Sequence, residues 1–106
     1  MIDEISVDDL KRRHDAGEDL LLLDVREPDE VATAAIPWAT IIPMAEIPAR
    51  IGELPRDKPI VVMCHHGGRS ERVAQFLAAN GYGNAVNLDG GIDAWSTSVD
   101  PSVPRY

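Results

Sequence analysis

The sequence predicts an α/β fold, with a mostly parallel central sheet of about five strands and helices on both of its faces. Short apolar runs of the kind found in strands buried on both faces alternate with segments of helical periodicity. The clearest of these runs are residues 20–25, Ile60–Met63 and Ala85–Leu88. Such alternation is typical of a parallel sheet whose crossover helices cover both faces.

The first helix is predicted from its start and stop signals. The hydroxyl of Ser6 can accept a hydrogen bond from a free N–H at the helix start, and Asp8 and Asp9 suit the positive end of the helix dipole. Gly17 is suited to end the helix. We therefore expect a capped helix ahead of the strand over residues 20–25.

A second helix and a further strand are predicted after that strand. Pro28 is well tolerated in the first turn of a helix, which we expect to reach about residue 34. Residues 40–42 are a candidate short strand. Beyond it, apolar residues recur at helical spacing but Pro48 interrupts them. Two alternatives remain for this stretch, a helix that begins near Pro48 or a kinked helix.

The central segment of the chain is predicted to be a strand, a tight loop and a helix. Ile60–Met63 is apolar, rich in β-branched residues and too short for a globular helix. Residues 70–80 place three apolar side chains on one helical face, and Gly81 can adopt the positive φ with which many helices end. The three side chains are Val73, Phe76 and Leu77.

The last strand and helix are predicted at the C-terminal end of the chain. Ala85–Leu88 is a short apolar strand, and the run Asp89-Gly90-Gly91 is expected to form a tight turn into a helix. Trp95 lies on that helix, and we expect its side chain in the core. The proline-rich residues 96–106 are expected to form an extended tail that can lie over the domain.

Length and composition predict a small intracellular domain. A chain of 106 residues has the size of one domain, so we expect a single domain over 1–106 with a core over about 5–95. One cysteine permits no internal disulfide, which fits a reducing compartment and a cytoplasmic location. The acidic N-terminus does not resemble a signal peptide, and no apolar run approaches membrane-spanning length.

The charge of the chain excludes some partners. The net charge is −8 and there is no run rich in lysine or arginine, which argues against nucleic-acid binding. An anionic substrate would meet an overall repulsive protein. Any attraction must therefore come from local groups such as loop N–H groups and Arg69.

Cys64 lies in the loop between the central strand and the following helix. Unpaired N–H groups converge with the positive end of the helix dipole there, so the loop predicts an anion site with a reactive thiolate at its mouth. Half-ionisation at pH 7 needs a pKa shift of about 1.5 units, or roughly 2 kcal/mol. A helix terminus supplies only about 0.3–1 kcal/mol. We expect the loop N–H groups, with Arg69 nearby, to supply the rest, while Gly67 and Gly68 allow the tight curl.

These residues carry a resemblance to a known family. The pattern Cys64-x-x-Gly67-x-Arg69-Ser70 after a hydrophobic strand resembles the active-site loop of rhodanese-like sulfurtransferases. Asp24-Val25-Arg26-Glu27 resembles the family motif after an earlier strand, and Asp89-Gly90-Gly91 with Trp95 resembles the motif near its end. The match runs in order over about residues 5–95.

The resemblance implies both a rhodanese-like fold and sulfur transfer. Cys64 would take the outer sulfur of thiosulfate or a persulfide and pass it to cyanide, a thiol or a protein acceptor, without a cofactor or a metal. The substrate and persulfide loop would comprise His65, His66, Gly67, Gly68, Arg69 and Ser70. Arg69 would orient an anionic donor or brace the loop, and Ser70 would cap the helix and donate to the sulfur.

Asp24 and Arg26 can be interpreted in two ways. The family resemblance implies that Asp24 and Arg26 shape the surroundings of the active site. The alternative is that Asp24 hydrogen-bonds the neighbouring loop and that Arg26 forms a surface or inter-loop ion pair.

Ala35 and Trp38 replace the histidine and the glycine that are usual in the family at these positions, and we expect Trp38 to fold against the sheet.

Three other functions fit the sequence less well than sulfur transfer. Cysteine phosphatases and arsenate reductases carry five residues between the cysteine and the arginine of the loop. Here only four residues separate Cys64 from Arg69, so the ring of amides is smaller and suits a sulfane sulfur better than a tetrahedral oxyanion. A catalytically silent binding module of the same fold is a second alternative. A metal site formed by Cys64, His65 and His66 is disfavoured, since three consecutive residues cannot easily face one ion.

Overall fold

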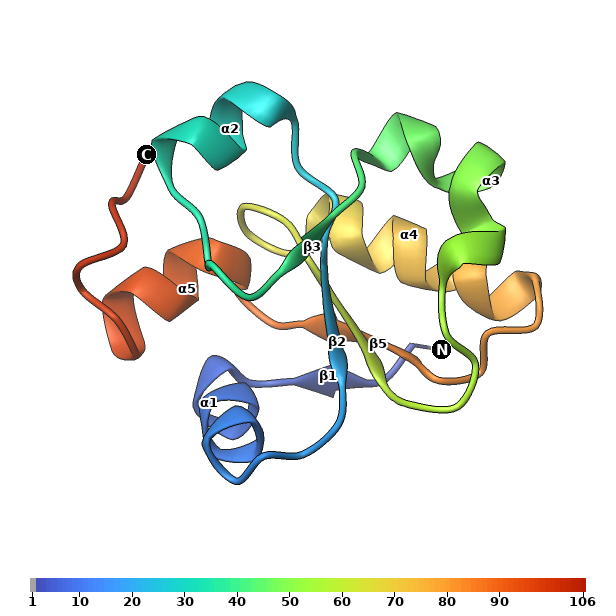
Figure 1. The fold of residues 1–106 in the computed structure, drawn as a ribbon. Helices are drawn as coiled ribbons and strands as arrows, with labels where there is room; N and C mark the ends of the chain where they lie inside the picture. The colour runs from blue at the N-terminus through green and yellow to red at the C-terminus, as the bar shows by residue number, and fades with distance from the viewer. Residues whose placement is uncertain (1) are drawn as a thin grey trace.

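A five-stranded parallel sheet forms the centre of the molecule (Figure 1). The computed structural model describes residues 2–106. The strand order is β1-β5-β4-β2-β3, and every neighbouring pair is parallel. This sheet confirms the predicted fold class. The strands are β1 (Glu4–Ile5), β2 (Leu21–Asp24), β3 (Thr40–Ile41), β4 (Ile60–Met63) and β5 (Ala85–Leu88).

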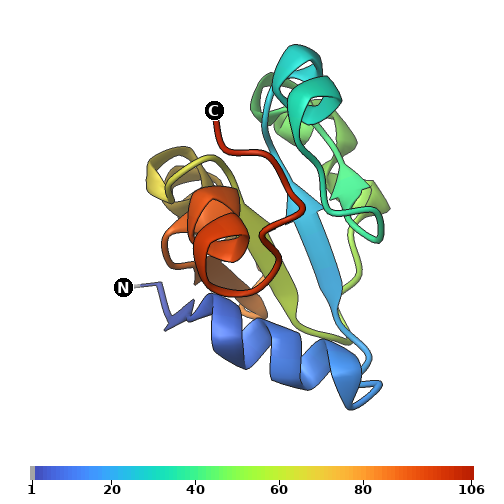
Figure 2. The ribbon, with the colours of Figure 1, turned by 90° about the vertical axis from the view of Figure 1, so that its left-hand side faces the viewer.

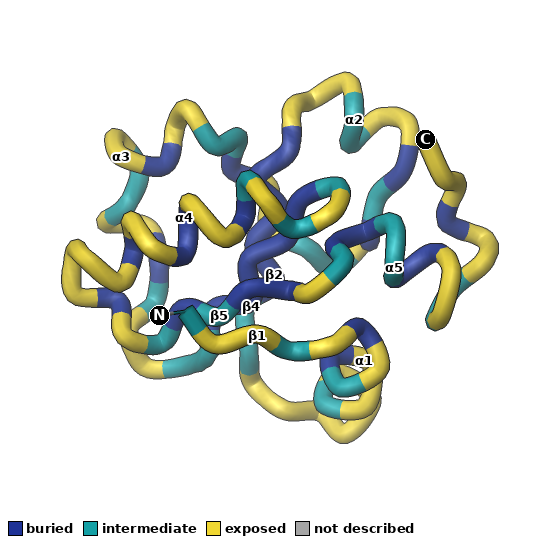
Figure 3. Tube along the Cα trace, turned by 180° about the vertical axis from the view of Figure 1, so that it is seen from behind, coloured by how far each residue is buried: buried dark blue, intermediate teal, exposed yellow. Residues whose placement is uncertain are grey.

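Helices cover both faces of the sheet, as Figures 2 and 3 show from two further directions. Helices α3 and α4 pack on one face, and α1 and α5 pack on the other. Short 3₁₀ turns precede and follow α3. The helices are α1 (Val7–Asp15), α2 (Pro28–Thr33), α3 (Ile47–Arg50), α4 (Gly68–Ala79) and α5 (Gly91–Ser98).

Strand β4 is the centre of the core, because its four residues are all buried between β2 and β5. Alternate side chains of a strand point to opposite faces. Val62 accordingly joins the apolar cluster beneath α3 and α4, whereas Val61 and Met63 join the cluster beneath α1 and α5. Since the strands are parallel, the loops after β2, β4 and β5 meet at one edge of the sheet.

The boundaries differ from the predicted ones in several places. Helix α4 begins at Gly68, two residues before the predicted start, and α5 continues to Ser98, into the stretch predicted as extended tail. The interrupted stretch around Pro48 is a 3₁₀ turn, a short helix with this proline in its first turn, and a second 3₁₀ turn. Proline fits the first turn because its missing N–H is not needed there.

Phe76 shares a helical face with Val73 and Leu77, as predicted, but it is not buried with them. Val73 and Leu77 are buried, but Phe76 remains 38% exposed. Consecutive helical residues are rotated by about 100°, and the buried stripe of α4 also includes Ser70 and Ala74. Phe76 therefore lies at the margin of the buried stripe and remains partly exposed to solvent.

The C-terminal residues return along the surface and lie over the domain (Figure 2). Val103 is buried in the cluster beneath α1 and α5, and the Ser96 hydroxyl donates to its carbonyl oxygen. This contact brings the end of the chain towards the loop that follows β4, where Tyr106 stacks on His65. None of the helices in residues 2–106 has the length and apolar character needed to cross a membrane.

The turn from β5 into α5 is packed tightly against the loop that contains Cys64. Gly91 has a φ of +58°, and a Cβ atom there would lie 2.4 Å from the carbonyl oxygen of Cys64 and 2.5 Å from that of His65. The N–H of Ile92 donates to the Cys64 carbonyl at 3.0 Å, and the N–H of Asp93 donates to the His65 carbonyl at 3.1 Å. The glycine turn is thus confirmed, and it also docks α5 on the loop.

We predict that Gly91→Ala destabilises the fold by about 2–4 kcal/mol, because the added methyl group meets two backbone carbonyls at a positive φ. Urea denaturation should show the loss. Gly52→Ala is the matched control, because its φ is not positive and a methyl group there would meet nothing within 4 Å. It should change the free energy of unfolding by less than about 0.5 kcal/mol. Equal stability of the two variants would contradict the docking role.

Candidate active site

Cys64 follows β4 directly at the sheet edge where the strand-end loops meet, and it is only 1% exposed. The loop curls back over its sulfur, with Gly67 at a φ of +121°. The N–H of Gly67 donates to Cys64 Sγ at 3.1 Å, and the hydroxyl of Ser70 lies 3.3 Å from the same sulfur. The structure therefore brings the predicted thiol, loop and helix start together around one atom.

These donors control the ionisation of the thiol. Burial by itself would raise the pKa of Cys64, but it is opposed first by hydrogen bonds from the Ser70 hydroxyl and N–H. The N–H groups of Gly67 and His66 act in the same direction, so the net pKa of the thiol is lowered. Donors that favour the thiolate are what a nucleophilic cysteine requires.

Ser70 is itself held by Asn87 on β5, a residue that sequence reasoning missed. Asn87 is buried and accepts a hydrogen bond of 2.5 Å from the Ser70 hydroxyl. Its amide nitrogen donates at 3.2 Å to the Gly67 carbonyl and at 3.2 Å to the carboxylate of Glu4. The sequence did contain a signal for Asn87, because it is a polar residue within a short buried strand. A buried polar side chain needs hydrogen-bond partners, which points to a structural role.

Arg69 is held in a bidentate ion pair with Glu30 of α2. The two N···O distances are 2.7 and 2.9 Å. Glu30 also accepts from the Glu27 N–H at 3.1 Å and from the Tyr106 hydroxyl at 2.8 Å. These hydrogen bonds lower the pKa of Glu30 to about 2, and the bond from Arg69 has the largest effect. Arg69 thus braces α4 against α2, and its positive charge is compensated by a carboxylate.

Asp24 and Arg26 form a fully buried ion pair beside that network. Their side chains are 1% and 0% exposed. Arg26 Nε donates to Asp24 Oδ1 at 2.9 Å, and Arg26 Nη2 donates to Oδ2 at 2.7 Å. Arg26 thus forms an ion pair, as one of the two predicted alternatives has it, but the pair is buried and not at the surface. The buried guanidinium has further partners, because Nη1 also donates to the Glu30 carbonyl and to the Tyr106 hydroxyl.

The two histidines of the loop have different surroundings. The ring of His65 stacks on that of Tyr106, with centroids 3.8 Å apart and planes 7° apart. Burial, followed by the proximity of His66, lowers the pKa of His65. The side chain of His66 is 67% exposed. The ring of His65 is therefore held against Tyr106 and that of His66 lies at the surface, whereas the backbone N–H of His66 faces the sulfur.

Trp38 is a packing residue, at some remove from the chemistry of the loop. Its ring stacks on His14 with centroids 3.7 Å apart and meets Trp95 edge-on at 6.1 Å. It belongs to the apolar cluster beneath α1 and α5, which agrees with the predicted packing against the sheet. Ala35 is half-buried.

Comparison with known proteins identifies relatives over the whole length of the chain. The family model of the rhodanese-like domain matches residues 6–98. A protein of Allochromatium vinosum named Sulfurtransferase is 43% identical, with 97% of this chain and 96% of that protein covered. The Putative sulfurtransferase YtwF of Bacillus subtilis is 42% identical, with 94% and 96% covered.

A solved structure supports the same relationship. The rhodanese-like domain protein from Staphylococcus aureus superposes with a TM-score of 0.86 and is 32% identical to this chain. The superposition covers 99% of each chain.

We predict that Ser70→Ala raises the pKa of Cys64 by roughly 1 unit, because a hydrogen bond to a charged group is worth about 1.5–3 kcal/mol and this hydroxyl is shared with Asn87. The rate of alkylation by iodoacetamide as a function of pH measures the shift. Since Cys64 is the only cysteine, the signal has one source. An unchanged profile would show that the loop N–H groups alone stabilise the thiolate.

Proposed function

The chain belongs to the rhodanese-like domain family, and on this basis we propose that it is a sulfurtransferase that carries sulfane sulfur as a Cys64 persulfide. The observation that carries the proposal is the convergence of loop donors on one buried sulfur, with the Gly67 N–H at 3.1 Å from Cys64 Sγ. Such a ring of donors stabilises an anionic sulfur during a covalent reaction.

The proposed reaction has two steps and needs no external oxidant or reductant. The Cys64 thiolate attacks the outer sulfur of thiosulfate, a new S–S bond forms, and sulfite leaves with the electron pair of the bond that breaks. Cyanide or a thiolate then attacks the terminal sulfur, and the Cys64 thiolate leaves. A persulfide donor reacts in the same way with a thiolate as the leaving group. This order predicts ping-pong kinetics.

The loop geometry favours sulfur transfer over phosphoryl transfer. In a phosphatase site the arginine fork would bind phosphate oxygens, but here both ends of the Arg69 fork are occupied by the carboxylate of Glu30. The nearby carboxylate of Asp93 is likewise paired with Arg105. Neither carboxylate is placed as an unpaired general acid.

The charges around the loop affect how a sulfur donor can be recognised. Arg69 and Arg26 are each paired with a carboxylate, and the chain has a net charge of −8. A small dianion therefore gains little from long-range attraction. We propose that the loop N–H groups, which need no net charge, provide the main recognition of the donor sulfur. Because the reaction needs the single cysteine as a free thiol, we place it in a reducing compartment such as the cytoplasm.

The decisive test is the mass of the intact chain. After incubation with thiosulfate and removal of the excess, we expect a gain of one sulfur atom that cyanide removes. The Cys64→Ser chain is the control and should gain nothing, because the sequence contains one cysteine. If neither thiosulfate nor glutathione persulfide gave an adduct, the proposal would fail, and a catalytically silent binding module would be the better interpretation.

We further predict that Glu30→Gln lowers the KM for thiosulfate by about 3- to 10-fold, because one uncompensated charge on Arg69 is worth about 1 kcal/mol towards an anion at a few ångströms. Steady-state kinetics with cyanide in excess measure the change. Glu71→Gln is the matched control, since it removes one exposed carboxylate from the same helix as Arg69 without releasing that arginine. An equal decrease in both variants would show a general charge effect and contradict the specific role of Glu30.

A further inference from the structure

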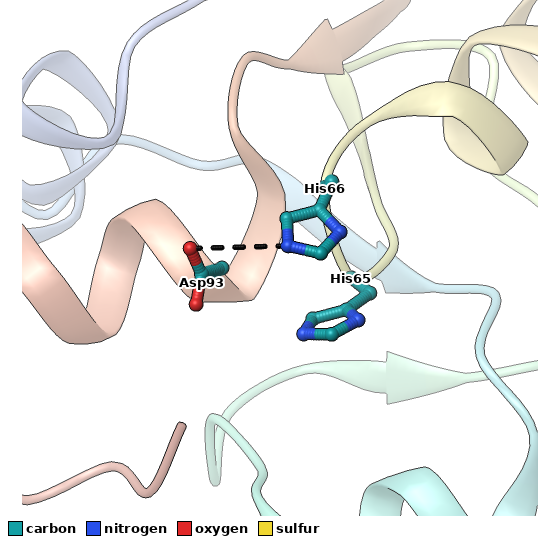
Figure 4. A group of neighbouring side chains, drawn as sticks. All are labelled: His65, His66 and Asp93. Atoms are coloured by element: carbon teal, nitrogen blue, oxygen red, sulfur yellow. Dashed lines mark ion pairs between the residues drawn. The ribbon is translucent and has the colours of Figure 1, made fainter. Parts of the chain in front are cut away.

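Three potential metal ligands lie together at the outer side of the Cys64 loop (Figure 4). His65, His66 and Asp93 each offer one ligand atom, and these atoms all lie within 4.8 Å of one another. Two of the residues come from the loop after β4 and the third from the first turn of α5. The sequence analysis weighed the two histidines as metal ligands only together with Cys64, and disfavoured that site. It did not predict that Asp93 would face them.

The backbone of the fold holds this group together. The N–H of Asp93 donates to the carbonyl of His65 at 3.1 Å, so the first turn of α5 cannot move independently of the loop. The side chain of Asp93 lies across from His66, with Oδ2 3.9 Å from Nε2. The three side chains are thus brought together by the same docking that shapes the loop.

One of the three ligands lacks a hydrogen-bond partner. Nε2 of His65 is buried and makes no hydrogen bond within the part of the chain that the structure describes. A buried polar atom without a partner is uncommon and calls for an explanation such as an unfilled ligand site. The stack on Tyr106 fixes the orientation of the ring, and metal-binding histidines need their rings held in this way by neighbouring groups.

The carboxylate of Asp93 can serve two partners. Arg105 Nε donates to Oδ1 at 3.0 Å, and Arg105 Nη2 makes a longer contact of 3.4 Å with Oδ2. Oδ2 is therefore the oxygen that is more weakly held, and it is also the one that faces His66. A metal on Oδ2 would leave the stronger bond to Oδ1 in place, so that Arg105 would continue to position the carboxylate.

The donor set selects the kind of ion. Two imidazoles and one carboxylate suit Zn²⁺ and similar transition metals, whereas Mg²⁺ and Ca²⁺ prefer all-oxygen sites. Ligand atoms around a tetrahedral Zn²⁺ lie roughly 3.3 Å apart. His66 Nε2 and Asp93 Oδ2, at 3.9 Å, are already near this spacing, and the exposed side chain of His66 is free to rotate.

We propose that His65, His66 and Asp93 form a binding site for a divalent transition-metal ion such as Zn²⁺, at the mouth of the Cys64 loop. Three protein ligands leave a coordination position open to water or to another ligand. The site does not depend on the sulfurtransferase proposal, because none of its side chains takes part in the proposed sulfur transfer. A bound ion would tie the loop to α5 more firmly.

The test is calorimetric titration of Zn²⁺ into the full-length Cys64→Ser chain, in which the thiolate cannot act as the ligand. We expect one site, and at least a tenfold weaker affinity in the same background with His66→Gln or with Asp93→Asn. His14→Gln is the matched control, because His14 is the third of the three histidines and stacks on Trp38. It should leave the affinity unchanged.

NMR of the histidine rings provides a structural readout in addition to the affinity. Zn²⁺ should shift the imidazole nitrogen NMR signals of His65 and His66 and leave that of His14 in place. The proposal would be overturned if the Cys64→Ser chain bound no Zn²⁺, if His66→Gln bound it equally well, or if His14→Gln lost the site. Because all of these measurements use the Cys64→Ser chain, their outcome is separate from that of the sulfur-transfer test.

Discussion

The shape of the Cys64 loop depends on the docking of α5 against its carbonyl groups. Ile92 and Asp93 use their N–H groups to bind the carbonyls of Cys64 and His65. With these carbonyls directed towards α5, the following N–H groups are free to face the sulfur. Gly91 makes the contact possible, since any larger residue would meet the same carbonyls. A turn distant in sequence therefore determines which backbone groups surround the thiol.

Charge compensation is the second organising feature of the site. Three arginines near the loop each pair with a carboxylate, namely Arg26 with Asp24, Arg69 with Glu30 and Arg105 with Asp93. The positive potential at the sulfur then comes chiefly from oriented N–H dipoles and the start of α4. Dipoles of this kind are fixed by the fold and stabilise an anion without requiring a net positive protein.

Local patterns were sufficient to predict the sheet, the Cys64 loop and the turn before α5, because each is encoded by neighbouring residues. The partners of the loop were not predictable in this way. Glu30 lies 39 positions from Arg69, and Tyr106 lies 76 positions from Glu30. Only the folded chain shows that these residues meet. Among the partners of the loop, only Asn87 had a local signal in the sequence, because it is a polar residue in a buried strand. Helical spacing placed Phe76 on the apolar face of α4, but it could not show that the buried part of this face excludes Phe76.

The burial of Cys64 has a consequence for the access of reagents to its sulfur. With 1% of the residue exposed, the thiolate itself is shielded from bulky reagents by the loop. In the proposed reaction, a Cys64 persulfide would place its terminal sulfur one S–S bond of about 2.05 Å beyond the cysteine. That terminal sulfur, and not the cysteine, would meet an incoming acceptor. The loaded and empty forms of the loop would then differ in reach by a single sulfur atom.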